Sequence, residues 1–126
     1  MALMTKSLED YLEAIYLRIA DGGIAQVSDV ATALSVKMPS VVKAIRELKS
    51  MGLVAQKPYS DITLTAKGKR VAAIVLGRHR LLKNFLRSLG VSEKRADRDA
   101  CLMEHILSEE TLDKIRDYTE KEGIHG

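Results

Sequence analysis

The sequence predicts a mainly α-helical protein with one short β-hairpin, and three observations support this prediction. Apolar residues recur at three- and four-residue spacings along most of the 126 residues, which is the period of an amphipathic helix. Two short β-prone runs, residues 53–55 and 62–64, flank a polar segment at 57–61. Hydrophobic residues make up 46% of the chain, which is enough to form a buried core.

The first half of the chain is predicted to form three helices. Leu8, Leu12, Ile15 and Ile19 define the first helix, which should stop at the glycine pair 22–23. A short helix over 29–34 is expected to begin after Ser28 as its N-cap, with Val30, Ala31 and Leu34 facing inward. A third helix should begin near Pro39, because proline fits a first helical turn. Its buried stripe is Val41, Ala44, Ile45 and Leu48, and Gly52 should end it.

The second half is predicted to be helical after the hairpin. Thr65 is expected to cap a long helix over 66–89, which Gly90 closes. Two further helices should follow near 93–107 and 109–121. Each opens with a serine, Ser92 or Ser108, followed by acidic residues that favour a helix N-terminus.

The order of helix, short helix, turn, helix and hairpin is that of a winged helix-turn-helix, whose third helix enters the DNA major groove. We therefore predict a winged-helix DNA-binding domain over residues 1–70, followed by a helical domain over 71–126. The alternative for the first domain is a protein-interaction module, because winged helices also mediate protein contacts.

The charge distribution favours DNA as the partner. Residues 37–70 carry a net charge of +6, whereas residues 1–36 carry −3 and residues 90–126 carry −4. On the third helix, six residues lie outside the buried stripe and are candidates to contact bases or phosphates: Lys37, Met38, Pro39, Ser40, Lys43 and Arg46. The candidate phosphate contacts in and after the hairpin are Lys57, Lys67 and Lys69.

A second pattern indicates a metal site. Cys101, Glu104 and His105 lie at i, i+3 and i+4 and should share one helical face. Asp10 and Glu13 form a carboxylate pair at i, i+3 on the first helix. With a histidine midway along the long helix (His79), these side chains suit a first-row divalent metal. Each also has an ordinary explanation, since a lone cysteine is often a small core residue and carboxylates often form a solvated face.

The sequence resembles the diphtheria toxin repressor and manganese transport regulator family from about Lys6 to Tyr118. The segments that carry the resemblance are Leu8–Tyr16, Pro39–Val41, Leu64–Gly68, Arg78–Leu82 and Ala100–His105, of which the last is the most specific. The resemblance implies a homodimeric winged-helix repressor of metal-uptake genes that a metal ion activates. It also implies that residues 71–126 are the metal-binding and dimerisation domain, in the shorter layout of the manganese-type regulators without an SH3-like domain.

The same resemblance implies a metal-ligand set, which is Asp10, Glu13, His79, Cys101, Glu104 and His105. The set is a hybrid, because Asp10 matches manganese-type members and Cys101 matches iron-type members. Lys83 stands where iron-type members have a glutamate ligand of a second site, and an ammonium cannot ligate a metal. Val42 stands where relatives have a small hydroxyl residue that can contact phosphate. We expect Mn²⁺ or Fe²⁺ to be the corepressor, and Zn²⁺ to be able to bind.

The predicted function is therefore a metal-activated, DNA-binding transcriptional repressor of manganese or iron homeostasis genes. Its expected partners are double-stranded operator DNA and a second copy of the chain, with no membrane and no small-molecule substrate. One cysteine and the lack of a long apolar run or signal peptide favour the cytoplasm. The alternative is a metal-independent or thiol-redox-sensing winged-helix regulator that uses Cys101. We do not expect an enzyme, because no His-Glu-x-x-His run, phosphate loop or nucleophile elbow is present.

Overall fold

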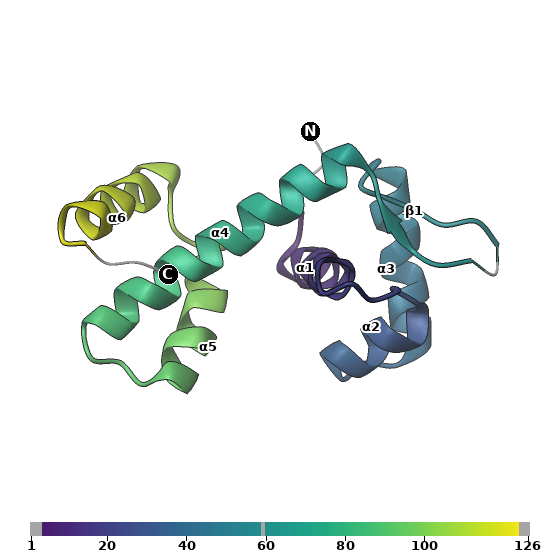
Figure 1. Ribbon diagram of the computed structural model, residues 1–126, viewed down its shortest axis with the longest axis horizontal. Helices are drawn as coiled ribbons and strands as arrows, with labels where there is room; N and C mark the ends of the chain where they lie inside the picture. The colour runs from purple at the N-terminus through teal and green to yellow at the C-terminus, as the bar shows by residue number, and fades with distance from the viewer. Residues whose placement is uncertain (1–3, 59, 124–126) are drawn as a thin grey trace. The chain divides into compact units, whose positions relative to one another are not determined.

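The computed structural model describes residues 4–58 and 60–123, and the chain divides into two compact units with the boundary between Ala73 and Ile74 (Figure 1). The prediction of a mainly helical chain with one hairpin is confirmed. The elements in chain order are α1 (Lys6–Ala20), α2 (Val27–Leu34), α3 (Met38–Ser50), β1 (Val54–Ala55), β2 (Thr63–Leu64), α4 (Ala66–Ser88), α5 (Glu93–Met103) and α6 (Glu109–Lys121). The boundary between the units falls within α4, which contributes residues to both.

The first unit is built on a core shared by α1, α2 and α3. Leu12 and Ile15 of α1 and Val41 and Leu48 of α3 are fully buried in this core, at the helical spacings that the sequence predicted. All three pairs among α1, α2 and α3 are in contact. Because its inner face is occupied in this way, α3 turns its opposite face to solvent.

The residue predicted to cap the start of α2 is wrong. Gln26, rather than Ser28, is the N-cap, and the helix begins at Val27. The backbone N–H of Gln26 donates to the Asp29 carboxylate over 3.0 Å, and the Gln26 side-chain amide donates to Asp61 over 3.1 Å. These two contacts hold Gln26 in the capping position and leave Ser28 within the first turn.

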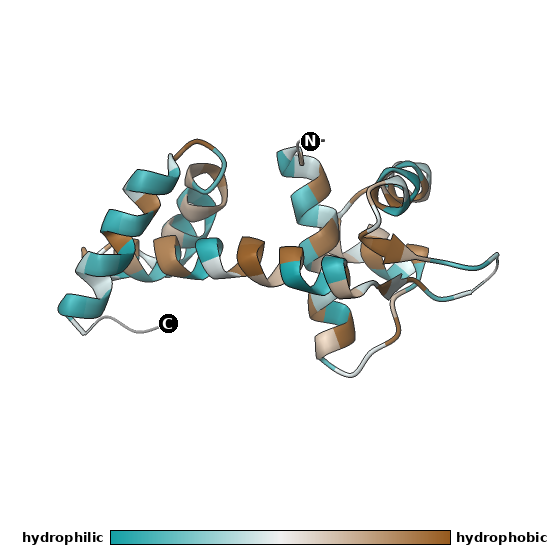
Figure 2. Cartoon of the chain, turned by 90° about the horizontal axis from the view of Figure 1, so that it is seen from above, coloured by the Kyte–Doolittle hydropathy of each residue, from teal (hydrophilic) through white to brown (hydrophobic). Residues whose placement is uncertain are grey.

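The hairpin is antiparallel, with Val54 opposite Leu64 and Ala55 opposite Thr63. Its strands are shorter than predicted, because the N–H of Ile62 donates to the Ala25 carbonyl over 2.8 Å instead of pairing with β1. Figure 2 shows hydrophobic strands and a hydrophilic connecting loop. Tyr59, which belongs to that predicted loop, lies outside the described residues.

The junction between the hairpin and α4 is a close backbone contact. The hydroxyl of Thr65 accepts the N–H of Gly68 over 2.9 Å, which confirms the predicted cap, and it donates to the Gly52 carbonyl over 2.7 Å. A Cβ on Gly68 would lie 1.9 Å from the carbonyl oxygen of Leu53. The approach of α4 to the end of α3 therefore requires glycine at position 68.

The second unit has its own core, in which Leu82 of α4, Ala100 of α5 and Leu112 of α6 are buried together. The helix predicted over 93–107 is shorter in the structure, because α5 ends at Met103. After it, the N–H of His105 donates to the Leu102 carbonyl, three residues back, so the chain tightens into a turn.

The serines that precede α5 and α6 differ in their capping. The Ser108 hydroxyl accepts the N–H of Thr111 over 3.1 Å, as predicted for a cap, whereas Ser92 makes no such bond. Among the described residues, no helix has both the length and the apolar character that a membrane span requires.

Candidate metal centre

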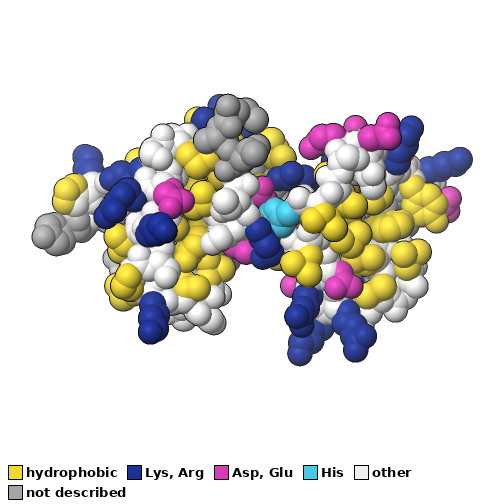
Figure 3. All heavy atoms as spheres, turned by 180° about the vertical axis from the view of Figure 1, so that it is seen from behind, with side chains coloured by type: hydrophobic (Ala, Val, Ile, Leu, Met, Phe, Trp, Pro, Cys, Tyr) yellow, Lys and Arg dark blue, Asp and Glu magenta, His cyan; other side chains and the backbone are white. Residues whose placement is uncertain are grey.

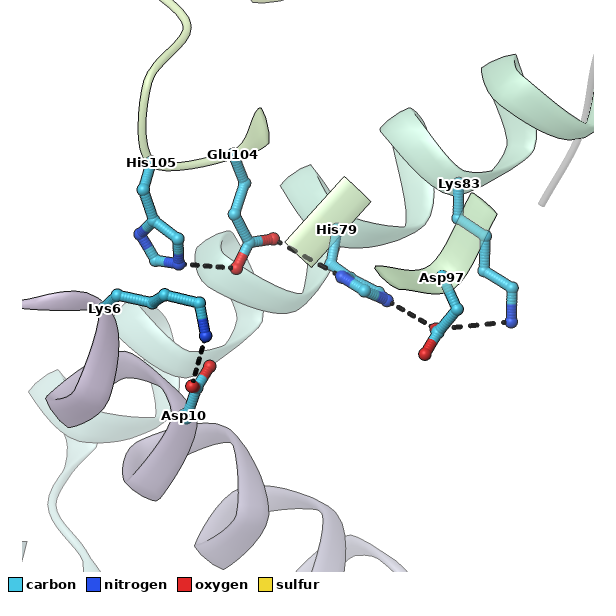
Figure 4. Close-up of polar contacts among 7 residues, drawn as sticks. All are labelled: Lys6, Asp10, His79, Lys83, Asp97, Glu104 and His105. Atoms are coloured by element: carbon cyan, nitrogen blue, oxygen red, sulfur yellow. Dashed lines mark hydrogen bonds and ion pairs between the residues drawn. The ribbon is translucent and has the colours of Figure 1, made fainter. Parts of the chain in front are cut away.

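Two imidazoles and one carboxylate converge in the second unit (Figure 4). Oε1 of Glu104 lies 3.2 Å from Nε2 of His105, and Oε2 of Glu104 lies 3.6 Å from Nδ1 of His79. The Glu104 side chain thus has one imidazole nitrogen at each of its two oxygens. The three side chains come from α4, from the C-cap of α5 and from the turn that follows it.

The packing of α4 against α5 brings these side chains together. Leu82 and Ala100 are fully buried in one core cluster. His79 precedes Leu82 by three residues on α4, and Glu104 follows Ala100 by four residues, so each lies about one helical turn from this contact. Glu104 keeps helical backbone geometry as the C-cap of α5, with its N–H donating to the Ala100 carbonyl over 3.0 Å, and the tight turn begins at His105, so the predicted helix does not continue through His105.

Glu104 is buried, with only 2% of the residue exposed. The two imidazole contacts are ion-pair distances and not hydrogen bonds, and neither oxygen of Glu104 accepts a hydrogen bond within the described part of the chain. Burying a carboxylate with so few donors costs free energy unless a positive charge compensates for it. A cation bound to both oxygens and to the neighbouring nitrogens would supply that compensation.

The spacing of these atoms fits a metal ion. Ligands at about 2.0–2.2 Å from a metal lie roughly 3–3.5 Å from one another. The contacts of 3.2 Å and 3.6 Å are therefore close to ligand spacing before any metal is bound. Imidazole nitrogens with a carboxylate form a donor set that first-row divalent metals accept, so the residues present fit the metal that the sequence predicted.

Asp97, which the sequence analysis did not select, contacts the other nitrogen of His79. Its Oδ1 lies 2.9 Å from Nε2 of His79 and 3.5 Å from Nζ of Lys83. The hydrogen bond with His79 lowers the pKa of Asp97 below its ordinary value; burial opposes this shift, and the charges of His79 and Lys83 add to it. A signal for Asp97 was present, because it precedes Cys101 by four residues and shares its helical face.

The remaining predicted ligands lie on two helices. Cys101 is half-buried on α5, three residues before Glu104. Asp10 and Glu13 are half-buried on α1, in the first unit, and Asp10 accepts a hydrogen bond from Lys6 over 2.8 Å. The sequence analysis also passed over Glu9, which is 7% exposed on α1 beside the core residue Leu8.

The candidate DNA-contact residues are exposed on the first unit. All six candidates on or just before α3 are exposed: Lys37, Met38, Pro39, Ser40, Lys43 and Arg46. Lys57, Lys67 and Lys69 are exposed as well. The ammonium of Lys67 donates to the carbonyl of Met51 over 3.2 Å, which holds it at the C-terminal end of α3. Figure 3 shows Lys and Arg side chains on the surface of both units.

Two family models together match most of the chain. Residues 3–62 match the model described as the N-terminal DNA binding domain of the iron dependent repressor. Residues 65–122 match the model described as the metal binding and dimerisation domain of the iron dependent repressor. The converging side chains of His79, Glu104 and His105 all lie in the segment that matches the second model.

Individual relatives agree with these matches. The chain is 44% identical over 113 residues to the HTH-type transcriptional regulator MntR of Lysinibacillus sphaericus, covering 90% of this chain and 81% of the relative. It is 43% identical over 116 residues to the transcriptional regulator MntR of Escherichia coli O157:H7, covering 92% and 75%.

A solved structure is similar in fold as well. The manganese regulator SloR superimposes with a TM-score of 0.81 at 26% identity, over 93% of this chain. The present chain spans about half, 55%, of the length of that structure.

Proposed function

The chain belongs to the iron dependent repressor family of metal-dependent transcriptional regulators, and we propose that it represses manganese-homeostasis genes when Mn²⁺ occupies the Glu104 site. It is a regulator and not an enzyme. The observation that carries the proposal is the buried Glu104 carboxylate between the imidazoles of His79 and His105, within the segment that matches the metal-binding model. We expect it to act in the cytoplasm, where its DNA target is found.

The proposed ligand set contains oxygen, nitrogen and sulfur donors. His79, Cys101, Glu104 and His105 belong to the second unit, and Asp10 and Glu13 to α1 of the first. Mn²⁺ and Fe²⁺ accept about six ligands and favour oxygen donors, which the three carboxylates supply. The thiolate of Cys101 is a soft donor that also favours Zn²⁺, so Zn²⁺ binding is expected too.

The metal would act through α1. This helix shares the core of the first unit with α3, where Leu12 and Ile15 are buried together with Val41 and Leu48. A change in the position of α1 therefore carries α3 with it, because a close-packed core moves as a body. A metal that binds its ligands best in the DNA-competent state shifts the population toward that state.

The exposed face of α3 is the proposed reader of operator DNA. Lys43 and Arg46 are exposed and lie on the side opposite the buried stripe, so they are free of the core and can reach base edges or phosphates. Lys57 in the hairpin and Lys69 after it add positive charge for backbone contacts.

A homodimer is the proposed assembly. Hydrophobic side chains lie at the surface of the second unit (Figure 3), among them Leu89 at 62% and Ile106 at 78% exposure. Exposed apolar area of this kind is typical of an interface. The family model that matches this unit is described as a dimerisation domain. A two-fold dimer would present two α3 helices to the two halves of a palindromic operator.

The proposal is tested by measuring operator binding after chelator treatment, during titration with Mn²⁺, Fe²⁺ and Zn²⁺. Binding should appear with metal and disappear again on chelation. Glu104→Gln keeps the size of the side chain but removes its charge, so it should lose the response, whereas Glu110→Gln on the exposed start of α6 should keep it. Chelator-resistant binding that peroxide abolishes would instead support the thiol-sensing alternative.

A further inference from the structure

Asp97 lies on the side of His79 that faces away from Glu104. The imidazole contacts Asp97 through Nε2 at 2.9 Å and Glu104 through Nδ1 at 3.6 Å (Figure 4). The two nitrogens of one ring are thus assigned to two different carboxylates. Asp97 is not one of the predicted metal ligands, and nothing in the proposed function uses it.

This arrangement determines which nitrogen of His79 can bind a metal. A neutral imidazole has one N–H donor and one lone pair, and an ionised carboxylate can only accept a hydrogen bond. Of the two contacts only the one to Asp97, at 2.9 Å, is a hydrogen bond, so in the neutral ring the N–H lies on Nε2 and the lone pair on Nδ1, which faces Glu104 at 3.6 Å. Carboxylates that hold ligating histidines in this way are common in metal sites.

Lys83 holds Asp97 in place. On α4, Lys83 follows His79 by four residues, and on α5, Asp97 follows Glu93 by four residues, so each pair lies on one helical face. Nζ of Lys83 lies 3.5 Å from Oδ1 of Asp97 and 3.7 Å from Oε1 of Glu93. The ammonium thus attracts the same Asp97 oxygen that His79 contacts, and it balances part of the negative charge near the ring.

We propose that Asp97, held by Lys83, is a positioning residue that fixes the ring of His79 with Nδ1 toward the metal. The inference rests on the proposed function, because it requires that His79 bind a metal. It assigns Asp97 to orientation rather than ligation: the carboxylate acts through the imidazole, and its charge is engaged by Lys83. The metal affinity of the chain should then depend on a residue that never touches the ion.

The first test compares Mn²⁺ affinity, measured by calorimetry, among variants of the full chain. Asp97→Ala should weaken binding about 10- to 100-fold, the usual effect of losing such a partner. Asp97→Asn keeps an oxygen acceptor and should fall between this variant and the parent. The matched control is Asp99→Ala, an exposed aspartate two residues further along α5, which should keep the parent affinity. Asp97 is 56% exposed at its side chain, so these changes leave the core intact.

The second test reports the ring orientation directly. In the Co²⁺-loaded chain, a metal-bound His79 whose Nε2 keeps its proton should show a paramagnetically shifted proton signal that is present in H₂O and absent in D₂O. His79→Gln assigns that signal, and Asp97→Ala should lose it through rapid exchange with solvent. The ring position of the proton is read from its Overhauser effects, because a proton on Nε2 lies beside both Hδ2 and Hε1, whereas a proton on Nδ1 lies beside Hε1 alone. A shifted signal without an effect to Hδ2 means that Nε2 binds the metal, and the inference is then wrong.

The outcomes separate the inference from the proposed function. Parent affinity in Asp97→Ala, with metal-dependent operator binding retained, would overturn only the role of Asp97. A parent chain that binds no metal would overturn both.

Discussion

Oε2 of Glu104 lies 3.6 Å from Nδ1 of His79, although one residue follows the end of α5 and the other lies midway along α4. His105 completes the group from the far side of the same carboxylate, at 3.2 Å. The burial of Glu104 between two imidazoles makes it the central residue of the proposed metal site.

Replacement of Glu104 by alanine should abolish metal-dependent DNA binding. His105→Ala and Cys101→Ala should have the same effect, because each removes a proposed ligand. Circular dichroism should show an unchanged fold, since the core around Leu82 and Leu112 does not include these side chains. Calorimetry with Mn²⁺ and operator binding are the measurements, and a full metal response in Glu104→Ala would falsify the site.

Lys43→Ala and Arg46→Ala should each weaken operator binding by roughly 1–3 kcal/mol if the lost contact is to a base edge. Lys57→Ala should weaken binding to specific and random DNA alike and should flatten its salt dependence, as expected for a phosphate contact. Fluorescence anisotropy at several salt concentrations distinguishes the two patterns. Lys121→Ala, at the end of α6, is the charge-matched control. Unchanged binding in both α3 variants would show that another element reads the operator.

Gly68→Ala should destabilise the chain, because the new Cβ would lie 1.9 Å from the Leu53 carbonyl oxygen and force the hairpin and α4 apart. We expect a loss of about 1–3 kcal/mol in the free energy of unfolding, the usual cost of overpacking. Gly77→Ala is the matched control on the same helix, where a Cβ meets nothing within 4 Å. That substitution should stabilise α4 by up to about 1 kcal/mol. Urea denaturation measures both, and equal stabilities would contradict the close contact.

The metal selectivity of the response should depend on Asp10, a hard oxygen ligand, and Cys101, a soft sulfur ligand. Cys101→Glu should shift the response toward Mn²⁺, because a carboxylate oxygen is harder than a thiolate. Asp10→Met should weaken activation by Mn²⁺ and shift the response toward Fe²⁺. The measurement is operator affinity against free metal concentration, under anaerobic conditions for Fe²⁺. If both variants keep the metal ranking of the parent, these ligands do not set the selectivity.

Sedimentation should show a dimer at micromolar concentration that depends on the exposed apolar residues of the second unit. Ile106→Glu places a charge at a side chain that is 78% exposed in the single chain, so it should favour the monomer without unfolding it. The control is Ile24→Glu, which is 57% exposed on the first unit. A stable monomer of the parent chain, with and without metal, would contradict the proposed assembly.

Much of the local structure was predictable from the sequence. The buried stripe of α3, the cap at Thr65 and the start of α6 at Ser108 all agree with the structure. These features depend on residues within one or two helical turns of each other, so their physical causes are present in short stretches of sequence. Helical spacing also selected Glu104 and His105 as ligand candidates, and the resemblance to a known family placed them in one ligand set with the other candidates.

The tertiary structure decided the features that depend on distant partners. Helix α2 begins earlier than predicted because the Gln26 side chain donates a hydrogen bond to Asp61. Ile62 lies outside β2 because its N–H donates to the Ala25 carbonyl. Asp97 acquired its role only because α4 and α5 pack together through Leu82 and Ala100, which brings it to the imidazole of His79. Helical spacing along one chain segment shows which residues share a face. It cannot show which face of another helix will lie opposite, because that is set by how the two helices pack in their shared core.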